Sequence, residues 1–530
     1  MTMKNISKYL MLTAGMMFLF TACVKDLDTV PIDKDEVTAA TVYDNPESYL
    51  QVLAKLYAGL AVSGQEGPAG NADISGIDEG FGQYLRGYWY HQELTTDEAV
   101  IAWNDQTIKD LHWQTWGSSD VFVSAMYYRI FYQIALCNEF IRETTDQKLD
   151  DRGVTGQLRT DIGYYRAEAR FLRALSYWHA LDLFGNVPFV TEEDKVGAFF
   201  PEQINRADLF HYIESELKAI ENQMMEPRTN DYGRADRAAA WMLLAKLYLN
   251  AEVYINQPMY TECLTYCNKI IDAGYSLESD YQRLFLADND HLNEVIFSVN
   301  FDGIRTKTWG GTTFIIHAAV GGSMDPSEFG IDGGWGGTRT TSAFVNLFDD
   351  ISGNTDSRAM FYTDGQNLEI EDIGLFTDGY AITKFKNVTS DGATGSDLTH
   401  VDTDFPMFRL ADVYLMYAEA VLRGGSGGDM ATALAYVNAL RERAYGDNSG
   451  DVTSIDLDFI LDERGRELYW EAHRRTDLIR FGKFTGGEYL WPWKGKVKEG
   501  TATDSKYNLF PIPAADLTAN PNLTQNPGYN

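Results

Sequence analysis

The chain has 530 residues, enough for two ordinary domains or for one large domain stiffened by repeats. Its formal net charge of −33 argues against nucleic acid or an anionic membrane surface as a partner. The same charge suits a neutral ligand, a cation or simple solubility, and a hydrophobic content of 45% is enough to build a sizeable core.

Residues 1–23 have the pattern of a secretory signal. Two lysines precede an apolar run over residues 9–20, which is too short for a membrane span with these flanks. The ending Thr-Ala-Cys resembles a bacterial lipobox, in which the cysteine is lipidated and becomes the first residue. We therefore expect a signal peptide at residues 1–22 and a lipid anchor on Cys23. The alternative is an ordinary signal peptide with a chance cysteine.

Residues 23–45 are predicted to form an extended tether, because they contain Pro31 and an acidic run. A single domain is expected from residue 46 to residue 530. Within it, apolar residues at three- and four-residue spacing predict α-helices. In chain order, the predicted helices cover residues 46–62, 121–144, 166–184, 206–224, 233–248, 260–271, 408–423, 430–443 and 455–479.

Two of the predicted helices carry similar alanine-rich segments. Residues 169–174 can be laid over residues 240–245 at an offset of about 71 residues, close to twice the ~34-residue period of tetratricopeptide repeats. The sequence therefore predicts a mainly α fold. Its scaffold would consist of tetratricopeptide-like helix pairs at about 160–275 and 407–480.

Two other stretches, about 64–116 and 295–405, lack sustained periodicity and are predicted to be rich in loops. Long ordered loops are usually functional. Brief strands are expected between these loops, at the short apolar runs 295–299, 313–316 and 381–385.

Sequence motifs for metal-assisted hydrolysis, phosphate binding and nucleophilic catalysis are absent from the chain. His473 stands among two arginines and an aspartate and is predicted to join a structural ion network. Acidic pairs such as Asp78-Glu79 and Asp97-Glu98 leave open a glycosidase-like pair of carboxylates.

Trp103, Trp309 and Trp335 lie outside the predicted helices, and the last two are embedded in glycines. A tryptophan on such a loop can present its flat face to solvent, and flat apolar faces stack on pyranose rings. Stacking with a few hydrogen bonds is the natural way to bind a neutral sugar. The alternative is that each indole anchors its own loop to the body of the domain.

Several motifs, taken in order, resemble those of one family. They are the lipobox and the segments 64–80, 167–190, 408–423, 463–484 and 509–529. Together they resemble the SusD-like (RagB/SusD) family of outer-membrane glycan-binding lipoproteins, and the resemblance runs nearly from end to end.

This resemblance implies an α-helical fold in which tetratricopeptide-like helix pairs support a loop-rich binding face. It also implies a protein that is not an enzyme and is held at the cell surface of a Bacteroidetes-like bacterium by a lipid anchor in the outer membrane. Such a protein captures a polysaccharide and caps a SusC-like TonB-dependent transporter.

The resemblance is strongest to the family's starch-binding founder member. It implies that Asp78 and Arg86 hydrogen-bond sugar hydroxyls and that Trp103, Trp309 and Trp335 form a stacking arc. The founder has Tyr at the position of Trp309 and Asn at that of Gln106, a further expected contact residue. The resemblance to a starch-binding protein favours a starch-like α-glucan. The two departures leave a β-glucan as the next candidate, because a third indole could flatten the platform.

The resemblance also extends to the segments 287–290 and 402–404, which look like the founder's calcium site. Asp290, Asp402 and Asp404 could supply hard oxygen ligands to a structural calcium ion. The alternative is that these are solvated loop acids. No cofactor is expected to be required.

Two functions from other classes remain as alternatives. One is a surface glycoside hydrolase, and the other is a repeat scaffold that binds a protein partner.

Overall fold

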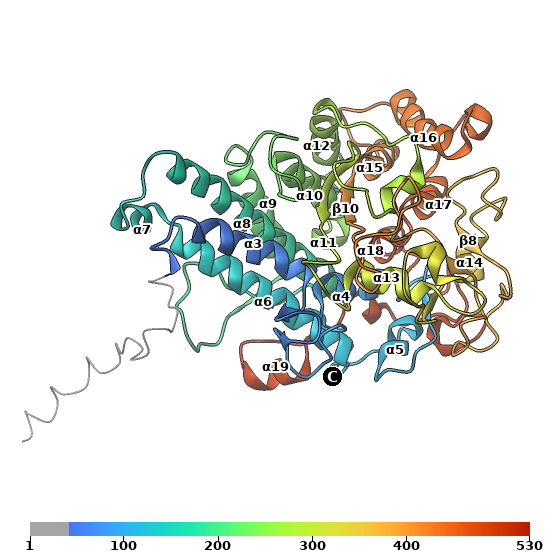
Figure 1. Cartoon of the computed structure of the whole chain (residues 1–530), viewed down its shortest axis with the longest axis horizontal. Helices are drawn as coiled ribbons and strands as arrows, with labels where there is room; N and C mark the ends of the chain where they lie inside the picture. The colour runs from blue at the N-terminus through green and yellow to red at the C-terminus, as the bar shows by residue number, and fades with distance from the viewer. Residues whose placement is uncertain (1–41, 530) are drawn as a thin grey trace, which may run out of the picture. The chain divides into compact units, whose positions relative to one another are not determined.

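The periodic segments of the sequence form helices in the computed structural model, which describes residues 42–529 (Figure 1). The predicted signal peptide, Cys23 and the tether up to residue 41 lie outside the described residues. Contacts divide the chain into two units, Met1–Tyr49 and Leu50–Asn530, and the site lies within the second. A single domain over 46–530 stays a prediction.

The described residues contain 17 α-helices and only short strands, so the predicted mainly α fold is confirmed. The helices are α3 (Ser48–Ala61), α4 (Tyr84–Gln92), α5 (Ile108–Trp113), α6 (Val121–Glu143), α7 (Asp146–Asp151), α8 (Gly156–Leu183), α9 (Arg206–Ile220), α10 (Arg237–Leu249), α11 (Ala251–Ile255), α12 (Tyr260–Asp272), α13 (Gly311–Ala319), α14 (Ser342–Val345), α15 (Leu410–Leu422), α16 (Met430–Tyr445), α17 (Leu457–Leu468), α18 (Arg474–Arg480) and α19 (Ala514–Ala519).

The strands pair as small antiparallel two-stranded sheets: β1 (Gly64–Gln65) with β2 (Asn71–Ala72), β3 (Val100–Ile101) with β7 (Thr338–Arg339), β4 (Val187–Pro188) with β5 (Gln203–Ile204), β6 (Val295–Val299) with β10 (Phe405–Arg409), and β8 (Phe361–Tyr362) with β9 (Ala381–Ile382).

The predicted helix pairs are present as α8 with α9, α10 with α12, and α15 with α16, each packed against its partner. Figure 1 shows the first two pairs as neighbouring helices. Alanines of α8 and α10, such as Ala169, Ala174 and Ala240, are fully buried, and their small side chains allow neighbouring elements to approach closely. Polar side chains cap the starts of α9, α10 and α16; at α10, for example, Asp236 accepts from Ala238 N, 2.8 Å.

The prediction of one continuous helix over residues 455–479 is wrong. The chain forms α17 and α18 with a break between them, where Trp470 (φ 64°) and Ala472 (φ 65°) adopt left-handed conformations. Long-range contacts account for the break. Glu471 accepts from Arg409 Nε, 2.6 Å, and from Lys384 Nζ, 2.7 Å, inside the core.

The prediction of a strand at residues 313–316 is also wrong, because these residues lie in α13. A short apolar run with β-branched residues resembles a strand. Every residue of α13 is buried, so no alternation of polar and apolar residues marks the helical period. Gly310 precedes it, and Gly311 N donates to Gln83 Oε1, 2.9 Å.

The runs at 295–299 and 381–385 contain strands, as predicted. The C-terminal segment contains the short helix α19.

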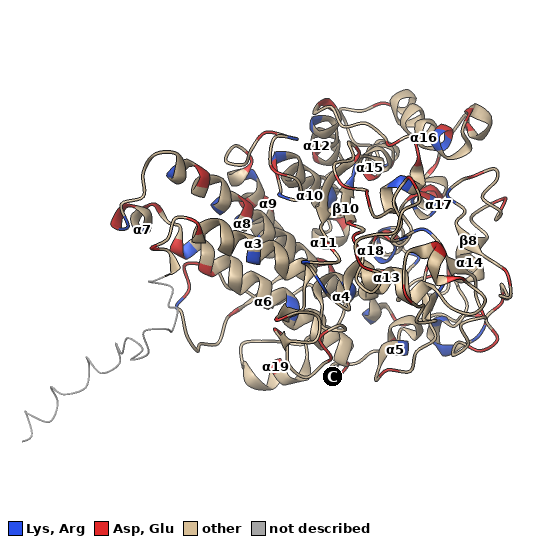
Figure 2. Cartoon of the chain, in the orientation of Figure 1, with Lys and Arg blue, Asp and Glu red and all other residues tan. Residues whose placement is uncertain are grey.

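A network of buried ion pairs joins β10, α16 and α17 to neighbouring loops. Arg409 Nη1 lies 2.9 Å from Glu294 and 2.7 Å from Glu467, and all three side chains are at most 1% exposed. Glu467 also pairs with Arg358 and Arg443. Figure 2 shows acidic and basic residues together at α17 and α18. The predicted structural role of His473 agrees with its place beside Lys246, 3.2 Å away.

Two buried carboxyls, Glu93 and Glu98, form a second polar cluster between α4 and the break after α17. Burial raises the pKa of Glu93 to about 7, and burial followed by the charge of Glu93 raises the pKa of Glu98. Two buried carboxyls so close together cannot both ionise easily, so they lose their protons as a coupled pair. Glu93 also accepts from His473 N, 3.1 Å, and Glu98 from Trp470 N, 3.1 Å.

Between residues 42 and 529, no helix combines the length and the apolar character needed to cross a membrane.

Replacing Arg409 with Met is expected to reduce the free energy of unfolding by about 3–5 kcal/mol, because buried carboxylates lose a partner. Urea denaturation measures the change. Arg305→Met is the control, since Arg305 is 83% exposed and its pair with Asp302 is worth less than about 1 kcal/mol. Equal destabilisation by the two substitutions would contradict the importance of the network.

Replacing Glu93 with Gln is expected to change how stability depends on pH. A raised folded-state pKa stabilises the protein fully below the unfolded value of about 4.5, and this contribution disappears as pH rises through about 7. The variant, whose amide has no proton to lose, should therefore gain stability relative to the native protein between pH 5 and pH 8. The midpoints of urea denaturation, measured across this pH range, test the expected gain in stability, with Glu139→Gln as an exposed control. A stability difference that does not vary with pH would rule out a raised pKa for Glu93.

Candidate functional site

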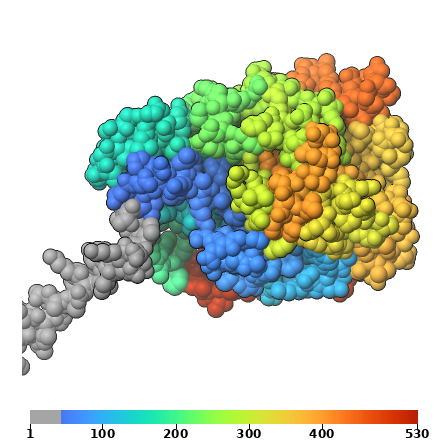
Figure 3. Space-filling model, viewed as in Figure 1, coloured from blue at the N-terminus to red at the C-terminus, as the bar shows by residue number. Residues whose placement is uncertain are grey.

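The structure brings the three predicted tryptophans together in one arc. The ring centroids of Trp103 and Trp335 lie 6.3 Å apart, and those of Trp309 and Trp335 lie 6.1 Å apart. All three side chains are partly exposed. Figure 3 shows yellow-green, yellow and orange segments of the loop-rich part on the viewed face, next to a blue segment from the N-terminal part of the domain.

Pairing of β3 with β7 brings Trp103 next to the loop of Trp335. Val100 pairs with Arg339 and Ile101 with Thr338, which places the chain after β3 against the chain before β7. Ala102 N then donates to Gly337 O, 2.9 Å. A Cβ on Gly337 would lie 2.7 Å from the Trp103 ring, so glycine is needed there for the indole to approach.

The C-terminal end of α13 holds the loop of Trp335. Trp335 N donates to His317 O, 2.7 Å, and Gly337 N donates to Ala318 O, 2.8 Å. The imidazole of His317 stacks on the Trp335 indole with centroids 4.7 Å apart and an interplanar angle of 21°. Trp103 Nε1 donates to Trp335 O, 3.1 Å, and links the two loops.

Arg86 lies beneath the arc and is only 4% exposed. Its Nη1 donates to Trp309 O, 2.8 Å, and its Nε donates to Tyr90 OH, 2.7 Å. The guanidinium also lies 4.3 Å from the ring centroid of Phe81 and 4.4 Å from that of Phe314. Arg86 therefore holds the backbone of Trp309 in place, and its direct contact with a sugar stays a prediction.

Asp78 and Trp309 converge on Gly80. A Cβ on Gly80 would lie 2.7 Å from Trp309 Cβ and 3.1 Å from Asp78 Oδ1. Asp78 is exposed and accepts from Gly80 N, 2.9 Å. This bond uses Oδ1, so the other carboxylate oxygen of Asp78 can accept from a ligand hydroxyl beside Trp309.

Gln106 lies on the loop of Trp103, in an exposed left-handed position with φ 43°. Neighbouring Asn104 Oδ1 accepts from Lys109 Nζ, 2.6 Å. Among the described residues, Gln106 has no measured contact with the arc, and its role stays a prediction.

Two histidines complete the arc and were not predicted from the sequence. His317 stacks on Trp335, and His400 packs against Trp309 with centroids 4.7 Å apart. Burial lowers the pKa of both imidazoles, so both rings are neutral at neutral pH. No spacing pattern marked either residue, because each reaches the arc from a different segment.

The predicted calcium residues Asp290, Asp402 and Asp404 line one cavity of about 550 Å³. Asp404 accepts from Tyr232 OH, 2.5 Å, and from Phe301 N, 2.7 Å, and burial raises its pKa to about 7. Within residues 42–529, no group of three or more His, Cys, Asp or Glu is arranged to hold a metal ion. The calcium site stays a prediction.

The acidic pair Asp97–Glu98 does not fit a glycosidase. Asp97 is fully buried and Glu98 is 2% exposed. Asp97 forms an ion pair with Arg474, 2.8 Å. These carboxylates are structural groups that a polysaccharide does not reach.

Comparison with known proteins connects the chain with one family. A model of the SusD family matches residues 362–529. The chain is 36% identical to the starch-binding protein SusD of Bacteroides thetaiotaomicron, over 96% of each protein. It is also 27% identical to SusD-like protein P25 of Formosa agariphila, over 80% of this chain and 82% of that protein.

Solved structures share the fold. Surface glycan-binding protein A from Bacteroides fluxus matches with a TM-score of 0.70 and 23% identity, over 92% of this chain and 100% of that one. Surface glycan-binding protein A from Bacteroides thetaiotaomicron, solved in complex with laminarihexaose, matches with a TM-score of 0.66 and 20% identity, over 91% and 99% of the two chains.

The names of these relatives describe binding proteins, and the prediction that the chain is not an enzyme is confirmed. The 36% identity along nearly the whole length decides the assignment: the chain belongs to the SusD family.

Proposed function

We propose that the protein is a polysaccharide-binding lipoprotein of the cell surface that captures a glucan without cleaving it. The observation that carries the proposal is the contiguous arc of Trp103, Trp335 and Trp309 on loops held by α13 and the β3–β7 pair. A curved row of indoles can contact successive sugar rings of one chain.

The chemistry of the arc suits an uncharged polymer. The rings offer apolar faces, and the histidines beside them are neutral because burial lowers the pKa of both. Stacking on each indole contributes about 0.5–1.5 kcal/mol beyond the burial of apolar area. Asp78 at the edge can accept a hydrogen bond from a hydroxyl and orient the sugar. A single site of this kind binds modestly, and long chains gain from repeated contacts.

A starch-like α-glucan is the first candidate ligand, and a β-glucan is the second. The 36% identity to a starch-binding protein supports the first. The complex of a structural relative with laminarihexaose supports testing the second. Trp309 stands where the founder of the family has Tyr. Its larger, flat indole is the feature that favours a flatter glucan chain.

The proposal includes delivery of the glucan to a SusC-like TonB-dependent transporter in the outer membrane. Lipidation of Cys23 would anchor the protein there, on the outer face. The resemblance to the family supports both points. In this arrangement the loops bind the sugar, and the helix pairs are available to the transporter.

Replacing Trp335 with Ala is expected to reduce affinity for the glucan by about tenfold or more, because the central ring of the arc is lost. Affinity electrophoresis of the lipid-free protein in gels containing starch or laminarin measures this as loss of retardation. Trp241→Ala is a matched control, since Trp241 is a partly exposed tryptophan on α10 whose Nε1 donates to Glu221, 2.9 Å. Unretarded migration of the native protein in both gels would contradict glucan binding.

The same samples separate the alternative functions. Release of new reducing ends in excess of the protein would identify a hydrolase. A repeat scaffold would be favoured if the native protein bound no glucan and a variant without the three tryptophans still bound a protein partner.

Replacing Gly337 with Ala is expected to weaken glucan binding about fivefold without removing any indole. The new Cβ would lie 2.7 Å from the Trp103 ring and displace it from the arc. Gly333→Ala is the control in the same loop, because no atom lies within 4 Å of a Cβ placed there. The prediction is wrong if both variants are retarded equally in the glucan gel.

A further inference from the structure

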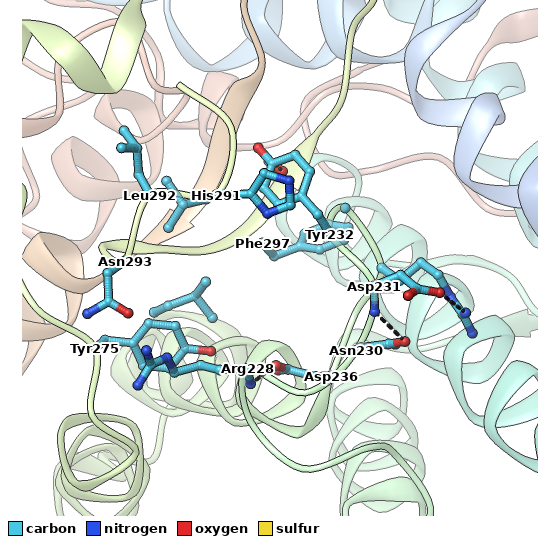
Figure 4. A pocket seen from close by; sticks show the side chains of 15 residues that line it. Arg228, Asn230, Asp231, Tyr232, Asp236, Tyr275, His291, Leu292, Asn293 and Phe297 are labelled. Atoms are coloured by element: carbon cyan, nitrogen blue, oxygen red, sulfur yellow. Dashed lines mark hydrogen bonds and ion pairs between the residues drawn. The ribbon is translucent and has the colours of Figure 1, made fainter. Parts of the chain in front are cut away.

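A second cavity lies between the segment before α10 and strand β6, and has a volume of about 460 Å³ (Figure 4). Volumes of this size are typical of small-molecule sites. None of the residues that line it belongs to the tryptophan arc. Its walls include Arg228, Tyr232, Tyr275, His291 and Asn293.

An aromatic pair forms one side of the cavity. The rings of Tyr232 and His291 pack against each other at a tilt, with centroids 4.4 Å apart and an interplanar angle of 38°. The hydroxyl of Tyr232 is fixed by donation to Asp404, 2.5 Å, while the side chain of His291 is 71% exposed. The pair is therefore a fixed platform with one ring open to a ligand.

Polar groups with unused hydrogen-bonding capacity form the other side. Figure 4 shows Arg228 and Tyr275 together, across the cavity from His291 and Tyr232. Within the described part of the chain, the one side-chain hydrogen bond of Arg228 runs from Nη1 to Gly274 O, 2.9 Å. Asn293 donates through Nδ2 to Ser276, 2.6 Å, so its carbonyl oxygen can accept from a ligand.

Two of the ten non-glycine residues with positive φ in the described part of the chain line this cavity. Arg228 (φ 64°) and His291 (φ 57°) both adopt the left-handed conformation, which is unfavourable for side chains of this size. Strained residues persist where the surrounding structure fixes them, and they cluster at ligand sites. The two strained residues supply the guanidinium and the open ring.

The charges of the cavity favour a neutral ligand. Arg234 is neutralised by Glu168, 2.5 Å, and by Asp231, 3.1 Å. An anion would meet the exposed carboxylate of Asp231, and a cation would meet Arg228. A saccharide has hydroxyls that both donate and accept and C–H faces that stack on rings, so it matches this mixture of groups.

We propose that this cavity is a second saccharide-binding site, in which His291 stacks on a sugar ring and Arg228 and Asn293 bind its hydroxyls. The proposal rests on the proposed function, because it assigns the same class of ligand to a separate site. Two sites on one protein raise the apparent affinity for a long polysaccharide more than for a short oligosaccharide.

Glycine substitutions test the site without endangering the fold. Arg228→Gly and His291→Gly remove the two ligand-facing side chains and relieve the left-handed strain, so the double variant should melt at the same temperature as the native protein or higher. Asn256→Gly is the matched control. Asn256 is an exposed left-handed residue (φ 54°) at the end of α11, away from this cavity.

Native mass spectrometry with maltoheptaose, and with laminarihexaose in parallel, counts the bound oligosaccharides. We expect two per chain in the native protein and in Asn256→Gly. We expect one in the double glycine variant, one in Trp335→Ala, and none in the combined variant. Retardation in the polysaccharide gel should fall two- to tenfold in the double glycine variant.

The outcomes separate this proposal from the proposed function. One oligosaccharide per native chain, lost in Trp335→Ala and kept in the double glycine variant, would overturn the second site and leave the arc in place. Binding that is lost in the double glycine variant and kept in Trp335→Ala would overturn the role of the arc and support the cavity. Absence of binding by the native protein would overturn both.

Discussion

Buried carboxylates in the C-terminal helices impose the strongest constraint on this structure. Glu467 is enclosed by Arg358, Arg409 and Arg443, and Arg409 also pairs with Glu471. A buried charge is tolerated only with its partners in place, so each pair fixes the relative positions of the elements that carry it. The network fixes β10, α16 and α17 in one arrangement, and the pair of Arg409 with Glu471 lies at the break between α17 and α18, where Trp470 and Ala472 are left-handed.

That arrangement extends through the core to the tryptophan arc. Trp470, at the break between α17 and α18, donates from Nε1 to Glu98 O, 3.0 Å, and its backbone carbonyl accepts from Trp89 Nε1, 3.1 Å. Trp89 packs against Phe314 with centroids 5.4 Å apart, and Phe314 packs against Trp103 at 6.1 Å. A continuous series of aromatic contacts therefore connects the charged network with the binding loops, which explains how loops without regular structure hold three indoles in fixed positions.

The sequence was sufficient to predict helices such as α3 and α12, because apolar residues recur at helical spacing along one face of each. It was insufficient for α13, which is buried on all sides, and for the break after α17, which depends on Arg409 and Lys384 far away in the chain. The three tryptophans were identified because they lie outside the predicted helices, two of them among glycines. Their mutual contacts, and those of His317 and His400, depend on a two-residue strand pair and on loop packing between segments that lie 18 to 232 residues apart, for which local patterns carry no signal.

The hydrogen bond from Trp103 Nε1 to Trp335 O has a consequence for selectivity. An indole has a single polar hydrogen, and in Trp103 this hydrogen is committed to the neighbouring loop. Any sugar that touches this ring can be held through its carbon face alone, which is nearly the same in many hexoses. Discrimination between epimers or linkages then has to come from the curvature of the arc and from groups at its rim, so loop geometry can change the preferred polymer while every aromatic residue is retained.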